Sequence, residues 1–345
     1  MSFDLRRRDS DRLPNTSLVS DLSTIPPVGA NRAIAGQEPK TRGDNSTMSA
    51  ELISGTKIAE DIRHELAGRI AQLKTKGVTP GLVMVRVGED PASVSYVSGK
   101  SKTSAELGIY SETIVYPENA GEKELLARIA ELNSNLMFHG ILVQLPLPKH
   151  IDEDKVLNAI DPLKDVDGFH PVNVGRMLIG EPYFLPCTPH GVQQLLIRSG
   201  NSPEGKHVVI CGRSNLVGKP LMAILMQKKA GANATVTICH TGTKNMAQIT
   251  RQADILVAAM GSPRIITADM VKDGAVVIDV GVNRIPDATK KTGFRLVGDT
   301  DFDAIKEKAS AITPVPGGVG PMTVTMLMVN TVRAAEMRLA AQRQG

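Results

Sequence analysis

The sequence predicts an α/β protein of two domains, with a cleft between them. Apolar runs of strand length, bounded by glycine or proline, alternate along the chain with segments of helical periodicity. The alternation is interrupted once, by the irregular stretch "DPLKDVDGFHPVNVGRM", and then resumes. The chain has 345 residues, which is enough for two domains with separate cores.

The first half of the pattern has the order β-α-β-α-β, which predicts a parallel sheet. The run "GLVMVRVG" (81–88) is apolar throughout, as is typical of a strand covered on both faces. Asp90 and Pro91 then predict the start of a helix, and Gly108 predicts its end. Two further strands, "YSETIVYP" and "HGILVQLPLP", follow with the helical segment "EKELLARIAELNSN" between them.

The second half opens with a helix in "CTPHGVQQLLIRSG", for which Thr188 is the predicted N-cap and Pro189 the first helical residue. Its predicted strands are "HVVIC" (207–211), "ATVTIC" (234–239), "ADILVAAM" (253–260), "GAVVIDVG" (274–281) and a short piece near "RLVGD". We therefore expect a first α/β domain over 48–187 and a second, Rossmann-type α/β domain over 188–316. The apolar-faced helix within 317–345 is expected to return to the first domain.

Residues 1–47 differ from the rest of the chain. They are polar and rich in Pro, Gly and Ser, and they lack periodicity, which predicts disorder. Their aspartates and glutamate argue against a transit peptide, and no apolar core for a signal peptide is present. Two interpretations stay open: a genuine tail, or a chain that truly starts at Met48.

The composition narrows the classes of partner. Hydrophobic residues make up 41% of the chain and charged residues 22%, and no run approaches the roughly 18 apolar residues of a membrane span. The net charge of +4 is too small to argue for nucleic acid, and the 3% of aromatic residues disfavours stacking on single strands. We therefore expect neither a membrane nor a nucleic-acid partner.

The three cysteines, Cys187, Cys211 and Cys239, lie far apart and form no C-x-x-C motif. This spacing indicates neither a zinc site nor a disulfide framework. Cys211 and Cys239 lie in apolar runs of strand length and are interpreted as small buried residues in a reducing compartment, the cytoplasm. The histidines form no ligand cluster in the sequence, so no metal is expected.

The segment "VVICGRSNLVGKPLMAILMQ" is predicted to be a strand, a tight turn and a helix. Its pattern, Gly212-x-Ser214-x-x-x-Gly218, departs from the dinucleotide fingerprint, but its place in a β-α-β unit would aim helix amides at a phosphate. A glycine turn in a non-binding domain is the alternative. No carboxylate ends the next strand, "TVTICHTGTK", and Arg213 lies in the turn, so NADP is favoured over NAD. His240 is interpreted as a packed strand-end residue.

A second candidate site centres on "YVSGK", in which Tyr96 and Lys100 share one helix face. Short-chain dehydrogenases use a Tyr-x-x-x-Lys pair, but there the glycine turn comes first, and here it follows by more than a hundred residues. Gln144 ends a strand just before Pro146, at the edge where open α/β sheets bind ligands. Asp167 lies in an acidic loop. The structural alternatives are a helix-surface pair, a strand-end amide and a solvated turn residue.

From about residue 50 onward the chain resembles the bifunctional methylenetetrahydrofolate dehydrogenase/methenyltetrahydrofolate cyclohydrolase family. The resemblance rests on "VGEDPASVSYVSGKSKTSAELGI", "GILVQLPLPKHI", "DPLKDVDGFHPVNVGRM", "PCTPHGVQQLL", "GRSNLVGKP", "DVGVNR", "VGDTDF" and "TPVPGGVGPMTVTML", in that order. The first 47 residues have no counterpart in it. The resemblance implies a homodimer that binds NADP, with a tetrahydrofolate derivative in the interdomain cleft.

The resemblance also implies roles for single residues. Tyr96 would stack on the pterin-side rings, and Lys100 would be the catalytic lysine with Gln144 as its hydrogen-bond partner. Asp167 would hold the pterin's amino edge. The implied cofactor residues are Gly212, Arg213, Ser214, Thr241 and Val282, and the folate site would be completed by Leu145, Pro316, Gly317 and Gly318.

The expected reaction has two steps. 5,10-Methylenetetrahydrofolate is oxidised with NADP to 5,10-methenyltetrahydrofolate, which is then hydrolysed to 10-formyltetrahydrofolate. A monofunctional dehydrogenase without hydrolysis is one alternative, and the presence of both Lys100 and Gln144 argues against it. A non-catalytic folate- or nucleotide-binding regulator is another, disfavoured by the complete set of catalytic positions.

Overall fold

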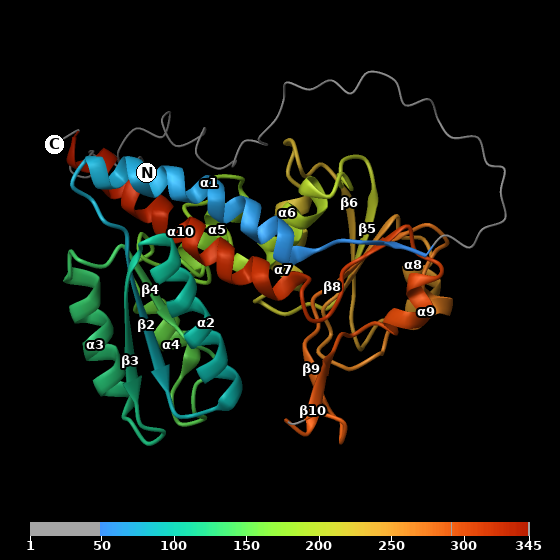
Figure 1. The fold of residues 1–345 in the computed structure, drawn as a ribbon, viewed down its shortest axis with the longest axis horizontal. Helices are drawn as coiled ribbons and strands as arrows, with labels where there is room; N and C mark the ends of the chain where they lie inside the picture. Colours follow the sequence, from blue (N-terminus) through green and yellow to red (C-terminus); the bar gives the residue numbers. More distant parts are fainter. Residues whose placement is uncertain (1–48, 291, 344–345) are drawn as a thin grey trace, which may run out of the picture.

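The structure, a computed structural model, describes residues 49–290 and 292–343. It has two α/β domains, side by side, with the long helices α1 (Gly55–Thr75) and α10 (Val319–Gln342) running across the top (Figure 1). The predicted α/β class with parallel sheets is confirmed. The disorder predicted for 1–47 lies outside the described residues.

The first domain contains a three-stranded parallel sheet in the order β3-β2-β4. Its strands are β2 (Gly81–Val87), β3 (Tyr110–Tyr116) and β4 (Gly140–Val143), and its helices are α2 (Pro91–Leu107), α3 (Glu122–Ser134), α4 (Glu153–Asn158) and α5 (Pro171–Leu178). Every residue of β2 is buried, which accounts for its continuous apolar run. The carboxyl ends of β2 and β4 point toward the same edge of the sheet, where α2 begins.

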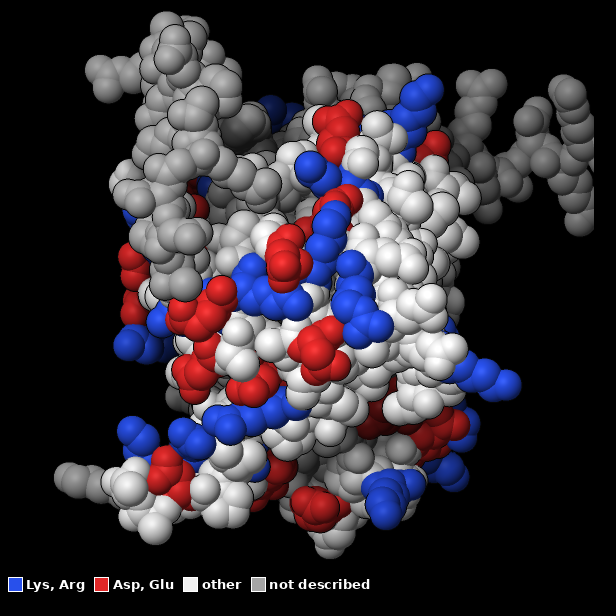
Figure 2. Space-filling view, turned by 90° about the vertical axis from the view of Figure 1, so that its right-hand side faces the viewer, with Lys and Arg blue, Asp and Glu red and all other residues white. Residues whose placement is uncertain are grey.

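The second domain is built on a six-stranded sheet in the order β1-β11-β8-β7-β5-β6, and every pair in it is parallel. The strands are β1 (Glu51–Leu52), β5 (His207–Cys211), β6 (Thr235–Cys239), β7 (Ile255–Ala258), β8 (Val276–Asp279) and β11 (Ala311–Ile312). The helices are α6 (Cys187–Arg198), α7 (Gly218–Leu225), α8 (Met246–Thr250) and α9 (Phe302–Lys306), with a 3₁₀ turn at Ala268–Met270. On the face seen in Figure 2, basic and acidic side chains are interspersed.

Two features of the second domain differ from what the alternation of runs suggests. Strand β1 joins its sheet through β11, although it precedes the whole first domain in the sequence. Strands β9 (Asn283–Pro286) and β10 (Phe294–Val297) form an antiparallel hairpin outside the main sheet, where the pattern predicted only a short piece. Both features rest on short, half-exposed strands, which leave no continuous apolar run to detect.

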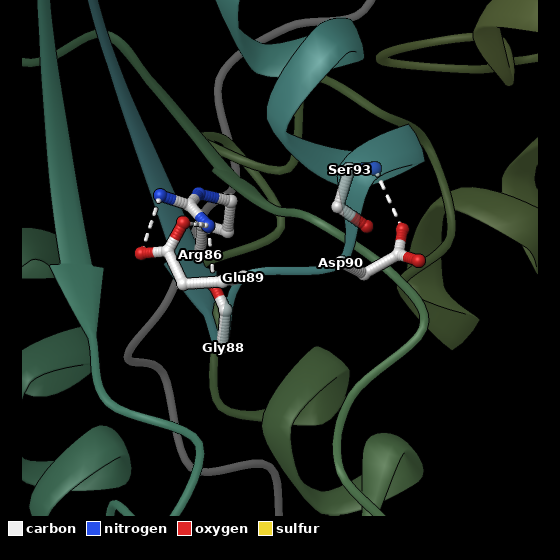
Figure 3. Close-up of polar contacts among 5 residues, drawn as sticks. All are labelled: Arg86, Gly88, Glu89, Asp90 and Ser93. Carbon is white, nitrogen blue, oxygen red and sulfur yellow. Dashed lines mark hydrogen bonds and ion pairs between the residues drawn. The ribbon is translucent and has the colours of Figure 1, made fainter. Parts of the chain in front are cut away.

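The ends of α2 agree with the sequence, and the start of α6 does not. Asp90 caps α2 by accepting a hydrogen bond from the Ser93 N–H at 2.8 Å (Figure 3), and Gly108 ends the helix at φ 71°. Helix α6 begins at Cys187, so the predicted cap at Thr188 was wrong. The Thr188 hydroxyl instead lies 2.9 Å from that of Thr323 on α10, which ties the two helices together.

Helices α1, α6 and α10 form the junction between the domains. Helix α10 packs against α1 and α6, and it also contacts α2, β2 and β4 of the first domain. Two bidentate ion pairs fix this arrangement, Arg69 with Glu336 at 2.6 and 3.0 Å and Arg198 with Glu65 at 2.7 and 2.9 Å. The domain limits at 187 and 316 stay a prediction.

Candidate active site

A pocket of about 180 Å³ lies between the two domains. Its walls come from α2, from the segment joining β8 to β9, from β10 and from the loop that precedes α10. The lining residues are Tyr96, Asp279, Val280, Gly281, Val282, Leu296, Pro314, Val315, Pro316, Gly317, Gly318, Val319, Gly320 and Pro321. The pocket is therefore at the carboxyl end of β8, the edge at which α/β sheets bind ligands.

Lys100 lies on α2, one helical turn after Tyr96, and only 6% of its surface is exposed. Its Nζ donates a hydrogen bond to Gln144 Oε1 at 2.9 Å. Gln144 is held by both its side chain and its backbone. Its Nε2 donates to Leu145 O at 2.7 Å, and its backbone N–H donates to Val85 O at 2.8 Å. These bonds leave Oε1 facing the lysine, so Gln144 orients the amine.

Asp167 lies close enough to Lys100 for each charge to affect the other. Burial lowers the pKa of Lys100 from its ordinary value, and the negative charge of Asp167 opposes that shift. Burial raises the pKa of Asp167, and the positive charge of Lys100 opposes it. The site therefore holds an amine that loses its proton more readily than an exposed lysine, beside a carboxyl group.

The predicted folate-site residues fall into two groups. Tyr96, 39% exposed, and the segment 316–318 line the pocket. Lys100, Gln144, Leu145 and Asp167 belong to the polar cluster behind Tyr96 rather than to the pocket wall. The helix spacing between Tyr96 and Lys100 joins the two groups, since residues four apart share a face.

The glycine turn follows β5 at the carboxyl edge of the second sheet. Gly212 has φ 138°, and its N–H donates to Cys239 O at 2.8 Å. A Cβ at this position would lie 2.1 Å from Ala259 O, so the backbone conformation and the close approach both require glycine. Ser214 Oγ accepts a hydrogen bond from the Val217 N–H at 3.0 Å, which shapes the entry to α7.

Arg213 and Thr241 come together from neighbouring strands. Arg213 is exposed, and its Nη1 lies 3.3 Å from His240 Nε2, at the end of β6. Thr241, also exposed, is the next residue after His240. Gly212, Arg213, Ser214 and Thr241 thus gather at the ends of β5 and β6, whereas Val282 lies apart from them, in the interdomain pocket.

The sequence reasoning missed two buried carboxylates that organise this edge. Asp299 accepts hydrogen bonds from the backbone N–H groups of Met260, Gly261 and Ser262 and from the Asn283 amide, at 2.6 to 3.0 Å. Asp279 accepts from the N–H groups of Gly281, Asp299 and Thr300 at 2.8 to 2.9 Å. Together they fix the loops after β7 and β8. The sequence signal for both was an acid directly after a short apolar run, Asp279 in "VVIDVG" and Asp299 in "RLVGD".

A third missed residue is Cys187. No role was assigned to it from the sequence, and the structure shows it buried, with its Sγ donating to Val166 O at 3.4 Å. Its thiol also lowers the pKa of the neighbouring Asp167 through a hydrogen bond, which makes it part of the cluster behind the pocket. Nothing in the spacing of the three cysteines distinguished it from the other two.

The loop that leads into α2 is held by Arg86. This side chain is buried, and its guanidinium donates to both carboxylate oxygens of Glu89, at 3.0 and 3.2 Å, and to Gly88 O (Figure 3). These bonds fix the shape of the loop directly before α2, the helix that contains Tyr96 and Lys100. Among the described residues, no group of three or more His, Cys, Asp or Glu side chains is arranged to hold a metal ion.

Comparison with known proteins agrees with this geometry. The family model described as the tetrahydrofolate dehydrogenase/cyclohydrolase catalytic domain matches residues 53–167. The model for the NAD(P)-binding domain of the same family matches residues 186–339. The two matches leave residues 168–185 between them unmatched.

Whole-chain relatives extend the match. The bifunctional protein FolD of Dehalococcoides mccartyi is 64% identical over 291 residues, which are 84% of this chain and 98% of that protein. FolD of Geobacillus thermodenitrificans is 56% identical and covers 86% of this chain and 100% of its own. The solved structure of Trypanosoma brucei FolD, a complex with NADP and an inhibitor, has 40% identity and a TM-score of 0.80, covering 85% of this chain and 99% of that chain. The chain belongs to the tetrahydrofolate dehydrogenase/cyclohydrolase family.

Proposed function

We propose that the two reactions of this family take place in the interdomain pocket, and that Lys100 acts as a base in hydrolysis but not in oxidation. The chain is an NADP-dependent methylenetetrahydrofolate dehydrogenase and methenyltetrahydrofolate cyclohydrolase of one-carbon metabolism. The observation that carries the proposal is the hydrogen bond from the buried Lys100 amine to Gln144, directly behind Tyr96.

In the oxidation, the protein's part is orientation. Tyr96 stacks on the substrate, and Asp167 holds the amino edge of the pterin, so that the methylene carbon faces the second domain. The backbone at Val282 bounds the nicotinamide side, and the loop 316–318 bounds the folate side. The lone pair of the adjacent nitrogen assists departure of the hydride, for which NADP held at the glycine turn would be the acceptor. No proton has to leave in this step.

In the hydrolysis, protons must move. Water adds to the cationic methenyl carbon and loses a proton, the ring carbon–nitrogen bond breaks, and the leaving nitrogen gains a proton. Lys100 is the general base that takes the proton from water, and Gln144 holds its amine in place without competing for that proton. Burial and the cationic substrate both favour the neutral amine. A positioned base of this kind typically contributes about 10²–10⁴-fold.

The residues of the glycine turn fit a dinucleotide. Gly212 allows the tight turn, since a Cβ there would lie 2.1 Å from Ala259 O, and the amino end of α7 follows the turn. Arg213 and Thr241 are exposed beside it and suit a 2′-phosphate, and no carboxylate ends β6 to hold a free ribose. This supports preference for NADP over NAD.

The protein is proposed to act as a homodimer in the cytoplasm, without a nucleic-acid or membrane partner. β3 is an edge strand of its sheet and exposes Tyr110 and Val115, which suits pairing with a second copy. Sedimentation should therefore give a dimer, and a monomer at micromolar concentration would contradict this. Among the described residues no helix is both long and apolar enough to cross a bilayer, and Cys187, Cys211 and Cys239 are free and buried.

The proposal is tested by following methenyl- and formyltetrahydrofolate together in the Lys100→Met and Tyr96→Ala variants. Lys100→Met should lose nearly all hydrolysis yet keep measurable oxidation, so that the methenyl compound accumulates. Tyr96→Ala should weaken both reactions, because stacking holds the substrate for each. A parallel loss in Lys100→Met would make Lys100 a positioning group only.

The same assay distinguishes the alternatives. Wild-type protein that oxidises but never hydrolyses would be a monofunctional dehydrogenase. Protein that binds NADP without turnover would be a regulator.

A further inference from the structure

The β9–β10 hairpin presents one face to the interdomain pocket. Val282, just before β9, and Leu296 on β10 both line the pocket. The strand register places Leu296 directly opposite Arg284. Residues directly opposite each other in an antiparallel pair share a face, and residues two apart along a strand do too. Arg284 therefore lies on the pocket face of the hairpin, beside Leu296 and beyond Val282.

The Arg284 side chain is exposed and packs over an aromatic ring. Its guanidinium carbon lies 4.8 Å from the centre of the Phe294 ring, on the same hairpin face. An arginine stacked on a ring keeps its N–H groups in the ring plane available for a carboxylate. Arg284 is thus held in position without its donors being used up by the ring.

Arg284 also reaches the first domain. The pKa of Asp90 is lowered mainly by its hydrogen bonds with Ser93 at the start of α2, and in smaller part by the positive charge of Arg284. The Asp90 carboxylate already caps the helix. Arg284 is therefore near enough to the amino end of α2 for its charge to act on Asp90.

The chemistry of the substrate points to this place. A tetrahydrofolate carries its pterin at one end and a glutamate at the other, with an aminobenzoyl group between them. The pocket lining contains one acid, Asp279, and neither lysine nor arginine, so it offers no partner for the glutamate carboxylates. The strand register places Arg284, a cation, on the same face as the pocket-lining Leu296.

We propose that Arg284 binds the glutamyl carboxylates of the folate substrate, so that binding strengthens as glutamates are added to the tail. The inference rests on the proposed placement of the pterin beside Tyr96 and Asp167. It assigns the β9–β10 hairpin a binding role for the substrate's tail, separate from the chemistry at Lys100. Each additional glutamate adds a carboxylate near the same guanidinium, which strengthens the attraction.

Arg284→Gln tests the inference, with Arg295→Gln as its matched control. Arg295 is on the same hairpin but alternates with Leu296, so its side chain faces away from the pocket, and it pairs with Asp287 at 3.8 Å. The KM and the calorimetric dissociation constant of methylenetetrahydrofolate are measured for the monoglutamate and a polyglutamate. Arg284→Gln should weaken binding of the monoglutamate roughly three- to tenfold, and of the polyglutamate more, as expected for a solvent-exposed charge pair.

The effect should fall on the folate and not on the KM for NADP, and Arg295→Gln should change neither. Unchanged folate affinity in Arg284→Gln, or an equal loss for mono- and polyglutamates, overturns the inference. The Tyr96→Ala variant distinguishes a failure of the Arg284 inference from a failure of the proposed function. If Tyr96→Ala weakens folate binding and Arg284→Gln does not, only the tail assignment fails. If neither weakens it, the folate does not occupy this pocket and the proposed function fails with it.

Discussion

At Lys100, burial and a nearby carboxylate act on one amine in opposite directions. Burial favours the neutral form, and Asp167 favours the ammonium form. Gln144 accepts a hydrogen bond from the amine, so it can orient either form. An amine whose pKa is lowered by burial gives up its proton more readily than an exposed lysine does, and so acts more readily as a base.

Arg213 is the residue on which cofactor choice depends. Arg213→Ala should weaken NADP binding roughly ten- to a hundredfold, the size of a lost charge-assisted hydrogen bond, and leave NAD nearly unchanged. Titrations with 2′,5′-ADP and 5′-AMP measure this without catalysis. Lys206→Ala, an exposed cation just before β5 at the opposite edge of the sheet, is the control. Equal losses for both nucleotides would show that Arg213 does not recognise the 2′-phosphate.

Single residues were predictable where local spacing decides their place. The four-residue spacing of Tyr96 and Lys100 put both on one helix face, and Gln144 ended its strand as predicted. Asp299 and Arg284 could not be predicted in this way. Their partners are backbone groups or strand neighbours whose positions depend on how distant loops and the hairpin fold.

In the turn between β5 and α7, adding one methyl group at Gly212 should lower the stability of the protein. Gly212→Ala would bring a Cβ to 2.1 Å from Ala259 O and force φ 138° on an L side chain, strain worth about 1–3 kcal/mol or more. Melting curves with and without NADP should show a lower Tm and a smaller shift on adding NADP.

Gly68→Ala on α1 is the matched control. Nothing lies within 4 Å of a Cβ there, so the substitution should stabilise the helix by about 0.5–1 kcal/mol. If Gly212→Ala behaved like Gly68→Ala, the turn would not require its glycine.

Among the elements, the long apolar runs were predicted well and the short polar strands were not. β5 was found at its observed limits, 207–211, because it is buried on both faces. β9 alternates partly buried and exposed residues, and β10 has one exposed residue among three partly buried ones; each strand has four residues, too few to separate from a loop. The start of α6 was missed by two residues because the Thr188 hydroxyl bonds to α10 rather than to its own helix.

For the stability of the whole molecule, strand β1 is expected to contribute more than residues 1–47. The curated relatives match 84% to 86% of this chain while covering nearly all of their own, and the first 47 residues lack the periodicity of a core. A chain starting at Met48 should therefore keep its Tm and both activities.

A chain starting at Ser54 should lose stability. It lacks β1, the pairing with β11 and the buried side chains of Ala50 and Ile53. Melting curves of the two truncations measure the difference. A large loss on starting at Met48, or none on starting at Ser54, would contradict this assignment.

The central claim is that hydrolysis needs the neutral amine of Lys100 and that oxidation does not. The most direct measurement is the pH dependence of the two maximal rates, taken separately at saturating folate for the wild type and for Asp167→Asn. A base must be deprotonated to act, so hydrolysis should rise with pH through the pKa of Lys100.

Asp167 raises that pKa, so replacing it with Asn should lower the pKa further and move the rising limb of hydrolysis to lower pH. The profile for oxidation should keep its position, even if its height falls. Profiles that shift together, or a hydrolysis limb that stays in place, would contradict the account.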